Sequence, residues 1–305
     1  MIAVIAILSF LICITYLVFP IVTILLAKFV PEKSIEELKI QPNIFLIMAV
    51  HNEASVIEDK LNSIIASVVD FNKLYCFIGA DACTDNTVDI ISRFQNKLNV
   101  DLVVFEKRNG KPQIINELVK LIHEKHQINE EDLFLLTDAN VMFHPNFIKN
   151  ISHPFSESNV GLVDGMVINP KKKSQTGKSE SVYVSIETQI KIAESNLWQC
   201  AMGPFGGAYM LRAKLYKNVP SNFLVDDFFI AFQVLKSGAK ALVNKNAICY
   251  EEVSGSFKEE FRRKVRISSG NFQNTFYFFP HYLNIFKKHN LICLLYTSDA
   301  ADEAK

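Results

Sequence analysis

The feature that most constrains the fold is a unit of apolar run, polar turn and helical segment that occurs three times in succession. The apolar runs cover residues 43–50, 74–80 and 100–105, and a fourth run covers residues 133–137. Each run is too short for a helix and is typical of a buried strand. Strands that alternate with helices predict a mostly parallel central sheet flanked by helices, which is an α/β fold.

Polar side chains follow these runs at the points where the strands would end. Glu53 lies just after the first run, Asp81 after the second, and Asp138 and Asn140 after the fourth. Ligands of open α/β sheets bind outside the carboxyl ends of the strands. Hard divalent cations prefer carboxylate and amide oxygens. We therefore expect Asp81 and Asp138 to face one ligand, with Asp138 and Asn140 as oxygen ligands, although each Asp alone could simply begin a turn.

The second half of the chain is less regular. Residues 160–168 are expected to form a strand, residues 169–179 a basic loop, and residues 180–198 and 257–272 helices. A glycine-rich turn contains Gly206 and Gly207, and an amphipathic helix is expected to begin at Asp226 and Asp227. This acid pair could interact with the helix dipole or supply a general base. A base must lie within hydrogen-bond reach of the hydroxyl it deprotonates, and the glycine-rich turn could leave space for that hydroxyl.

Basic residues at two places are candidates for phosphate contact. Lys111 follows the turn Asn109–Gly110 and could meet a phosphate, although an exposed Lys is otherwise simply solvated. The helix expected at residues 257–272 carries a cluster of Arg262, Arg263, Lys264 and Arg266. This cluster could grip a diphosphate, since Arg suits phosphate oxygens. It could also be a solvated face or a membrane-surface patch.

Composition narrows the class of protein. The 305 residues carry a formal net charge of +0, so there is no bulk basic footprint for nucleic acid. The six Cys are scattered with no Cys-x-x-Cys pair, which argues against a zinc site or disulfide framework and fits a reducing compartment. The glycine patterns of P-loop NTPases and dinucleotide dehydrogenases are missing from the sequence.

The amino-terminal residues predict a membrane anchor. Residues 1–27 contain no charged residue and are long enough to cross a bilayer, so we expect a transmembrane helix at residues 1–28 and a charged linker at residues 29–42. Lys28 and Lys33 follow the apolar stretch. The basic side tends to stay cytoplasmic, which predicts an inner-membrane protein whose body faces the cytosol. A cleaved signal peptide is the alternative, but it would have a basic start and a shorter apolar core.

The carboxyl-terminal residues are expected to be of two kinds. Residues 276–292 are aromatic and are expected to lie near the membrane surface. Residues 293–305 resemble a translated sequencing-library adapter, so we expect the natural reading frame to depart near Ile292 and the natural chain to continue. They are excluded from the fold, which leaves residues 43–275 as the catalytic domain.

The motifs, taken in order, resemble those of family 2 glycosyltransferases of the GT-A fold, of the membrane-anchored kind that builds bacterial cell-surface polysaccharide. Each motif is weak alone, and the order of the set carries the resemblance across about residues 43–275. The matching stretches are Val50-His51-Asn52-Glu53, Asp81-Ala82-Cys83-Thr84-Asp85, Asn109-Gly110-Lys111, Asp138-Ala139-Asn140, Gly206-Gly207-Ala208, Val225-Asp226-Asp227 and Arg263-Lys264-Val265-Arg266.

The resemblance implies a role for each motif. Asp138 and Asn140 would hold Mg²⁺ or Mn²⁺ on the diphosphate of a UDP- or GDP-linked sugar donor. Asp227, beside Asp226, would be the base that activates a hydroxyl of a glycan or lipid-linked acceptor. The turn at Gly206 and Gly207 would lie on the acceptor side. The remaining donor-binding residues would be Glu53, Asp81, Lys111, Arg263 and Arg266.

The implied reaction is direct displacement at the anomeric carbon with inversion. A nucleotide-diphosphate leaving group needs no protein acid when a divalent cation and basic side chains stabilise its charge. One base is then sufficient, whereas a glycosidase wants two carboxylates.

Departures from the family pattern keep alternatives open. Asn140 stands in place of a second Asp, Ala49 where a Pro is common, and Arg263 and Ile267 in place of a Gln and a Trp. The missing Trp favours transfer of one or a few sugars over a processive polysaccharide synthase, which remains an alternative. A non-enzymatic membrane-anchored binding protein is another. A haloacid-dehalogenase-type phosphatase is disfavoured because Asn140 cannot shuttle a proton.

Overall fold

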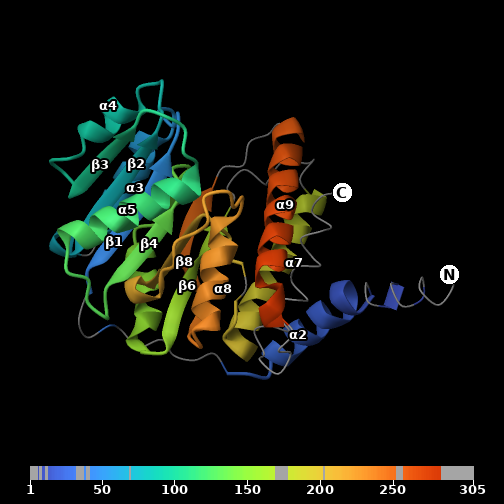
Figure 1. The fold of residues 1–305 in the computed structure, drawn as a ribbon. Coiled ribbons are helices and arrows are strands. Elements are labelled where there is room, and N and C mark those ends of the chain that lie inside the picture. The colour runs from blue at the N-terminus through green and yellow to red at the C-terminus, as the bar shows by residue number, and fades with distance from the viewer. Residues whose placement is uncertain are drawn as a thin grey trace.

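The protein is built around one eight-stranded sheet with helices on both of its faces (Figure 1). The computed structural model describes residues 6, 9–10, 13–31, 38, 42–68, 70–168, 178–201, 203–251 and 257–282. The strand order is β3-β2-β1-β4-β7-β6-β8-β5. The strands are β1 (Ile44–Val50), β2 (Leu74–Asp81), β3 (Val100–Phe105), β4 (Leu133–Thr137), β5 (Val141–Phe143), β6 (Val160–Ile168), β7 (Ala208–Arg212) and β8 (Lys240–Glu251).

The first four strands in the sheet, β3, β2, β1 and β4, are all parallel, as predicted. Beyond β4 the sheet is mixed, because β7 is antiparallel to both β4 and β6, while β6 and β8 are parallel. The short strand β5 pairs antiparallel with the end of β8. The carboxyl ends of the parallel strands therefore share one edge, where ligands bind in open α/β sheets.

Helices connect these strands and cover the sheet. They are α2 (Phe19–Ala27), α3 (Ile57–Ser67), α4 (Thr87–Ser92), α5 (Lys111–Lys125), α6 (Phe147–Ser152), α7 (Lys178–Trp198), α8 (Asp226–Lys236) and α9 (Phe257–Tyr282). Alternate residues of β1 point to opposite faces: Phe45 and Ile47 join the core formed with α5 and α8, and Leu46 and Met48 join the core formed with α3 and α6. A strand buried on both faces reads as a continuous apolar run, which explains the runs that form β1, β2 and β4. Strand β3, at the edge of the sheet, is only partly buried.

Two expected helix ends were wrong. The capping side chains of residues 84–87 predict a helix that runs to about Leu98, but this helix ends at Ser92. The apolar residues Phe94 and Leu98 are still buried, because the chain continues in tight turns against the sheet. The helix that begins at Phe257 continues past the expected end at Phe272 to Tyr282.

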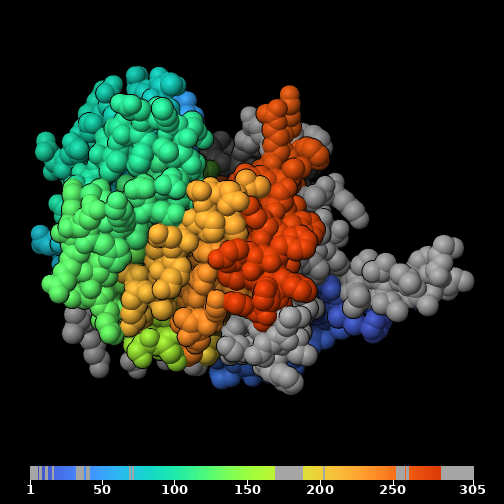
Figure 2. All heavy atoms as spheres, in the orientation of Figure 1, coloured from blue at the N-terminus to red at the C-terminus, as the bar shows by residue number. Residues whose placement is uncertain are grey.

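This longer α9 places part of the predicted membrane-proximal segment in the core. Phe278 and Tyr282 are buried, and the Phe278 ring lies 4.2 Å from the ring of Phe232 on α8. Phe276 and Phe279 of the same helix are exposed. Figure 2 shows α8 and α9 side by side on one face of the molecule. The aromatic spacing therefore serves helix packing on one side of α9, and residues 283–292 lie outside the described part.

The amino-terminal helix α2 packs on α7, where the rings of Phe19 and Trp198 stack with centroids 5.6 Å apart. A five-residue π-helical segment, Ile14–Val18, precedes α2. Among the described residues, no helix combines the length and hydrophobicity needed to cross a bilayer. Nine of the 28 residues in the predicted span lie outside that part of the chain.

Arg212 at the end of β7 is a buried cation that we expect to dominate local stability. Its guanidinium donates to the carbonyls of Val160, Phe155 and Glu157 and pairs with Glu131 at 2.7 Å. Arg212→Met would leave three carbonyls without these donors, so we expect unfolding free energy to fall by about 3–5 kcal/mol. Urea unfolding of the wild-type protein and of Arg212→Met measures this difference, and a loss of unfolding free energy below about 1 kcal/mol would contradict the prediction.

Candidate active site

The turn between β4 and β5 places Asp138 and Asn140 at the sheet edge. The backbone N–H of Asp138 donates to the carbonyl of Gly207 at 3.2 Å, and the Thr137 hydroxyl donates to the same carbonyl at 3.0 Å. Lys60 of α3 lies beneath this turn and donates to the Thr137 hydroxyl at 2.8 Å and to the carbonyl of Val141 at 2.5 Å. The Asp-x-Asn turn is therefore held at both ends and tied to the glycine-rich turn.

Lys60 was not among the site residues predicted from the sequence. Its side chain is fully buried, with Nζ 3.5 Å from the centre of the Phe143 ring, and burial lowers its pKa to about 7. The position of Lys60 on the buried stripe of α3, next to Leu61, was the available signal. A Lys is almost never fully buried without a reason, and here the reason is the support of the Asp138 turn.

Lys111 connects the two halves of the site. Gly110, with φ +83°, precedes α5, and Pro112 lies in the first turn of this helix. Lys111 Nζ lies 2.7 Å from Oδ1 of Asp138 and 3.7 Å from Oδ2 of Asp226. Burial alone would lower the pKa of Lys111, but Asp138 and Asp226 outweigh burial and raise that pKa above its ordinary value. Lys111 is therefore a permanent cation between an expected donor-side acid and an expected acceptor-side acid.

Asp227 faces the glycine-rich turn at the start of α8. Its Oδ1 accepts from the Phe228 backbone N–H at 2.6 Å, and its Oδ2 would lie 2.5 Å from a Cβ added to Gly206. Burial, and then the charge of Asp226, raise the pKa of Asp227 to about 6. A base works best with a pKa near the working pH. The two adjacent acids therefore have different contacts: Asp226 pairs with Lys111, and Asp227 faces the expected acceptor side.

Gly206→Ala is expected to reduce transferase activity strongly. Gly206 has φ +79°, a conformation disfavoured for Ala, and the new methyl group would push into Oδ2 of Asp227. We expect kcat to fall by roughly 100-fold, since displacing a reacting group by about 1 Å can reduce the rate by this factor. Gly238→Ala is the matched control, because Gly238 has φ +89° with nothing within 4 Å of an added Cβ. Equal losses in the two variants would assign the effect to backbone strain alone.

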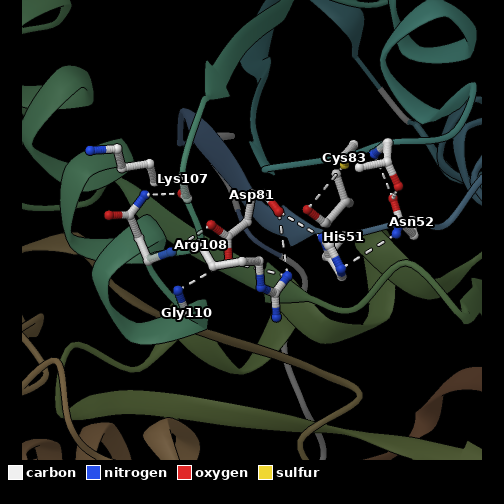
Figure 3. A network of polar contacts seen from close by, with 10 residues as sticks. His51, Asn52, Asp81, Cys83, Lys107, Arg108 and Gly110 are labelled. Carbon is white, nitrogen blue, oxygen red and sulfur yellow. Dashed lines mark hydrogen bonds and ion pairs between the residues drawn. The ribbon is translucent and has the colours of Figure 1, made fainter.

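Asp81 anchors the turn that leads to Lys111 (Figure 3). Its carboxylate accepts from the backbone N–H groups of Asn109 at 2.8 Å and Gly110 at 3.0 Å, and it pairs with Arg108 at 3.4 Å. His51 Nδ1 contacts the carbonyl oxygen of Asp81 at 2.7 Å. Asp81 therefore lies at the predicted edge and holds the Arg108–Gly110 turn. Its role in nucleotide binding stays a prediction.

Glu53 lies in the same electrostatic field. Burial raises its pKa, and the charges of Asp138 and Asp85 raise that pKa further. Its backbone N–H donates to the hydroxyl oxygen of Thr87 at 2.8 Å. Asn52 and Ala82, at the ends of β1 and β2, have φ of +54° and +53°. Strained backbone of this kind gathers at functional sites.

The two predicted donor-binding arginines, Arg263 and Arg266, have contacts in different parts of the structure. Arg263 reaches toward the Asp-x-Asn turn through Glu251, whose Oε1 lies 3.7 Å from Arg263 Nη2 and 3.2 Å from Nδ2 of Asn140. Arg266 instead donates to the carbonyl of Leu224, two residues before Asp226, at 2.8 Å. The structure therefore brings Arg263 to the turn and leaves Arg266 supporting the entry to α8. Glu251 was not predicted from the sequence, because the polar residues of β8 interrupt the apolar pattern that would have marked the end of a strand.

The donor set at this edge suits a hard divalent cation held jointly with a substrate. Asp138 and Asn140 offer a carboxylate and an amide oxygen, and Mg²⁺ is usually bound by one or two carboxylates together with substrate phosphates. Among the described residues there is no group of three or more acidic, His or Cys side chains placed to form a protein-only cage. The carboxylate and amide oxygens of this turn are the ligand types that a cation shared with a diphosphate would use.

An open sheet with polar strand ends, a lysine between two acids, and a paired acid beside a glycine turn are the features expected of a glycosyltransferase of the GT-A fold. The sequence profile described as glycosyltransferase like family 2 matches residues 42–270. The chain belongs to this family and is a glycosyltransferase. This confirms the class expected from the ordered motifs and overturns the non-enzymatic and phosphatase alternatives.

Known proteins similar to this chain include curated polysaccharide synthases. The poly-beta-1,6-N-acetyl-D-glucosamine synthase of Staphylococcus epidermidis is 24% identical over 233 residues, which cover 74% of this chain and 54% of that protein. The synthase of the same name from Staphylococcus aureus strain COL is 22% identical over 245 residues, covering 79% and 56%. The chain thus spans about half the length of these relatives.

Solved structures agree on the fold. The mannosyltransferase PcManGT from Pyrobaculum calidifontis, in complex with GDP-Man and Mn²⁺, superposes with a TM-score of 0.75 at 20% identity, covering 98% of this chain and 85% of that one. S. aureus TarS residues 1–349, in complex with UDP-GlcNAc, gives 0.54 at 15% identity, covering 75% and 65%. At these identities the likeness shows the GT-A fold.

Proposed function

We propose that this glycosyltransferase moves a sugar from a nucleotide-diphosphate donor to an acceptor hydroxyl, with inversion at the anomeric carbon. The observation that carries this proposal is the division of the acid pair. Asp226 pairs with Lys111 at 3.7 Å, while Asp227 is turned to Gly206 with a pKa raised to about 6. One free base beside a glycine turn, and one cation shared with Asp138, suit a direct displacement.

The reaction follows from these positions. Asp227 accepts the proton of the acceptor hydroxyl as its oxygen bonds to the anomeric carbon. The bond from that carbon to the donor diphosphate breaks on the opposite face, which gives inversion. Lys111 and Arg263 would hold the leaving diphosphate by charge and hydrogen bonds. Mg²⁺ or Mn²⁺ bound with Asp138 and Asn140 would neutralise the charge that develops on the leaving group.

The donor class is expected to be UDP- or GDP-linked, since the structural neighbours named above contain GDP-Man and UDP-GlcNAc. Calorimetric titration of the purified protein with UDP and with GDP, each with and without Mn²⁺, tests this proposal. We expect Mn²⁺-dependent binding of at least one nucleotide. Flat traces for both nucleotides with a folded protein would overturn the proposal.

Processive synthesis is a second candidate, because the curated relatives are polysaccharide synthases. Against it, Ile267 stands where the family's acceptor-side motif carries a Trp, and it is only half-buried on α9. Product length separates the two candidates. Short products that do not grow with time would support transfer of one or a few sugars, and long products at low turnover would support a synthase.

We also propose that the enzyme works at the cytosolic face of the inner membrane. Large apolar side chains of the π-helical segment Ile14–Val18, of α2 and of α9 are exposed, and they are of the kind that a lipid surface would cover. They include Leu17, Ile21, Leu25, Phe272, Phe276 and Phe279. Flotation with lipid vesicles tests this placement, and protein that stays at the bottom of the gradient would contradict it.

A further inference from the structure

Asn140 poses a chemical problem at the proposed cation site. An amide carries one acceptor oxygen and one NH₂ donor group, so only one of its two orientations can serve a cation. The amide is also neutral, so the turn offers one negative charge where two aspartates would offer two. Cation affinity depends on the charge of the ligands and on the rigidity of the site. Asn140 therefore needs a partner that fixes its orientation.

Glu251 meets that need by its place in the sheet. It ends β8, and in the antiparallel pairing of β5 with β8 it lies opposite Val141, the residue after Asn140. Glu251 Oε1 accepts from Asn140 Nδ2 at 3.2 Å. An ionised carboxylate only accepts, so the amide must give it the NH₂ group, which leaves the amide oxygen for another partner. The Glu251 side chain is only 14% exposed, so the contact is shielded from water.

The charge of Glu251 also acts on the same space as Asp138. Burial raises the pKa of Glu251, Arg263 opposes this rise, and Asp138 adds to it. Glu251 therefore places a second carboxylate beside the Asp138–Asn140 turn. Arg263, 3.7 Å from Glu251, has five N–H donors in all and can pair with Glu251 while others remain for a phosphate.

We propose that Glu251 is a positioning residue for the cation site formed by Asp138 and Asn140. It holds the Asn140 amide with its oxygen free for the cation, and it returns the negative charge that Asn140 lacks. This inference rests on the proposed metal-assisted reaction. A merely structural Glu251, one that only ties β8 to α9, would make the same contacts, so the test must separate the two roles.

Moving the carboxylate from position 251 to position 140 separates the positioning role of Glu251 from a merely structural one. The measurement is the Mn²⁺ affinity of the purified protein at saturating UDP or GDP, whichever the wild-type protein binds, by titration calorimetry and by the electron paramagnetic resonance of free Mn²⁺. Glu251→Gln removes the charge and admits either orientation of the amide, so we expect Mn²⁺ affinity to fall by roughly 10–100-fold. Adding Asn140→Asp to Glu251→Gln restores a carboxylate at the turn, and we expect affinity within about threefold of wild type.

The matched control is Glu130→Gln. Glu130 pairs with Lys214 at 2.9 Å on the surface, before β4 begins, at the opposite end of that strand from Asp138. We expect its Mn²⁺ affinity to equal that of wild type. Unchanged affinity in Glu251→Gln, or a loss that Asn140→Asp does not restore, would overturn the proposal. Wild-type protein that binds nucleotide without any dependence on Mn²⁺ would instead refute the cation site, and this inference with it.

Discussion

Replacing Asp227 by Asn is expected to lower kcat by about 10²–10⁴-fold while leaving nucleotide affinity unchanged. The amide keeps the size of the side chain but cannot accept the proton of the acceptor hydroxyl. Asp226, not Asp227, pairs with Lys111, so the donor side should be unaffected. Steady-state transfer assays together with nucleotide titrations measure both quantities. Transfer retained at the wild-type rate would remove Asp227 as the base.

The pH dependence provides a second readout for Asp227. Its pKa is raised from 3.8 to about 6, mainly by burial, so the carboxylate is protonated below about pH 6. We expect kcat/KM of the wild-type enzyme to fall as the pH is lowered through 6. Ionisation of a group with a raised pKa costs folded stability as pH rises from about 4 to 6. The unfolding free energy of Asp227→Asn at pH 8 should therefore be no lower than that of the wild-type protein. A measurement with this result would exclude misfolding as the cause of lost activity.

Replacing Asp138 by Ala is expected to weaken Mn²⁺-dependent nucleotide binding by at least about 100-fold. This exceeds the roughly 10–100-fold typical when only a partner of a metal ligand is lost. The variant also removes one of the two acids that pair with Lys111, whose Nζ lies 2.7 Å from Asp138 and 3.7 Å from Asp226. We therefore expect weak binding of nucleotide without Mn²⁺ to persist or to increase, because only Asp226 then neutralises the charge of Lys111. Titrations with and without Mn²⁺ separate the two effects.

Asp70→Asn is the control for Asp138→Ala. Asp70 accepts from the backbone N–H of Asn72 at 2.9 Å and lies before the amino end of β2, away from the carboxyl ends of the strands. Its nucleotide binding should match that of wild type with and without Mn²⁺. A similar loss of Mn²⁺-dependent binding in both variants, or none in Asp138→Ala, would contradict a cation held by Asp138.

Three of the four parallel strands, β1, β2 and β4, were predictable because they are buried on both faces. Such strands must be apolar at every position, so residues 44–50, 74–81 and 133–137 stand out in the sequence. Strand β8 did not, because Lys240–Glu251 is only partly buried and its polar residues break the pattern. Strand β5 has only three residues, too few to show a period. The mixed half of the sheet was therefore incompletely predicted.

The candidate site divides in the same way. Residues that end a buried strand or begin a helix carry a local signal, and Asp81, Asp138 and Asp227 were found by it. Lys60 and Glu251 contact the Asp138–Asn140 turn from 77 and 111 residues away in the chain, as the separations of their hydrogen bonds show. Periodicity cannot reveal contacts over such distances, since it reports only on the few residues of one element.

The sequence by itself determined the α/β class, the sheet edge at which we propose that ligands bind, and the order of the motifs, because burial and strand ends leave local patterns. Only the tertiary structure decided how the polar side chains pair. It placed Lys111 between Asp138 and Asp226 and brought Asp227 next to Gly206. It also placed Asn140 within hydrogen-bond distance of Glu251. These pairings depend on which strands become neighbours in the sheet, and that is set by packing of the whole chain.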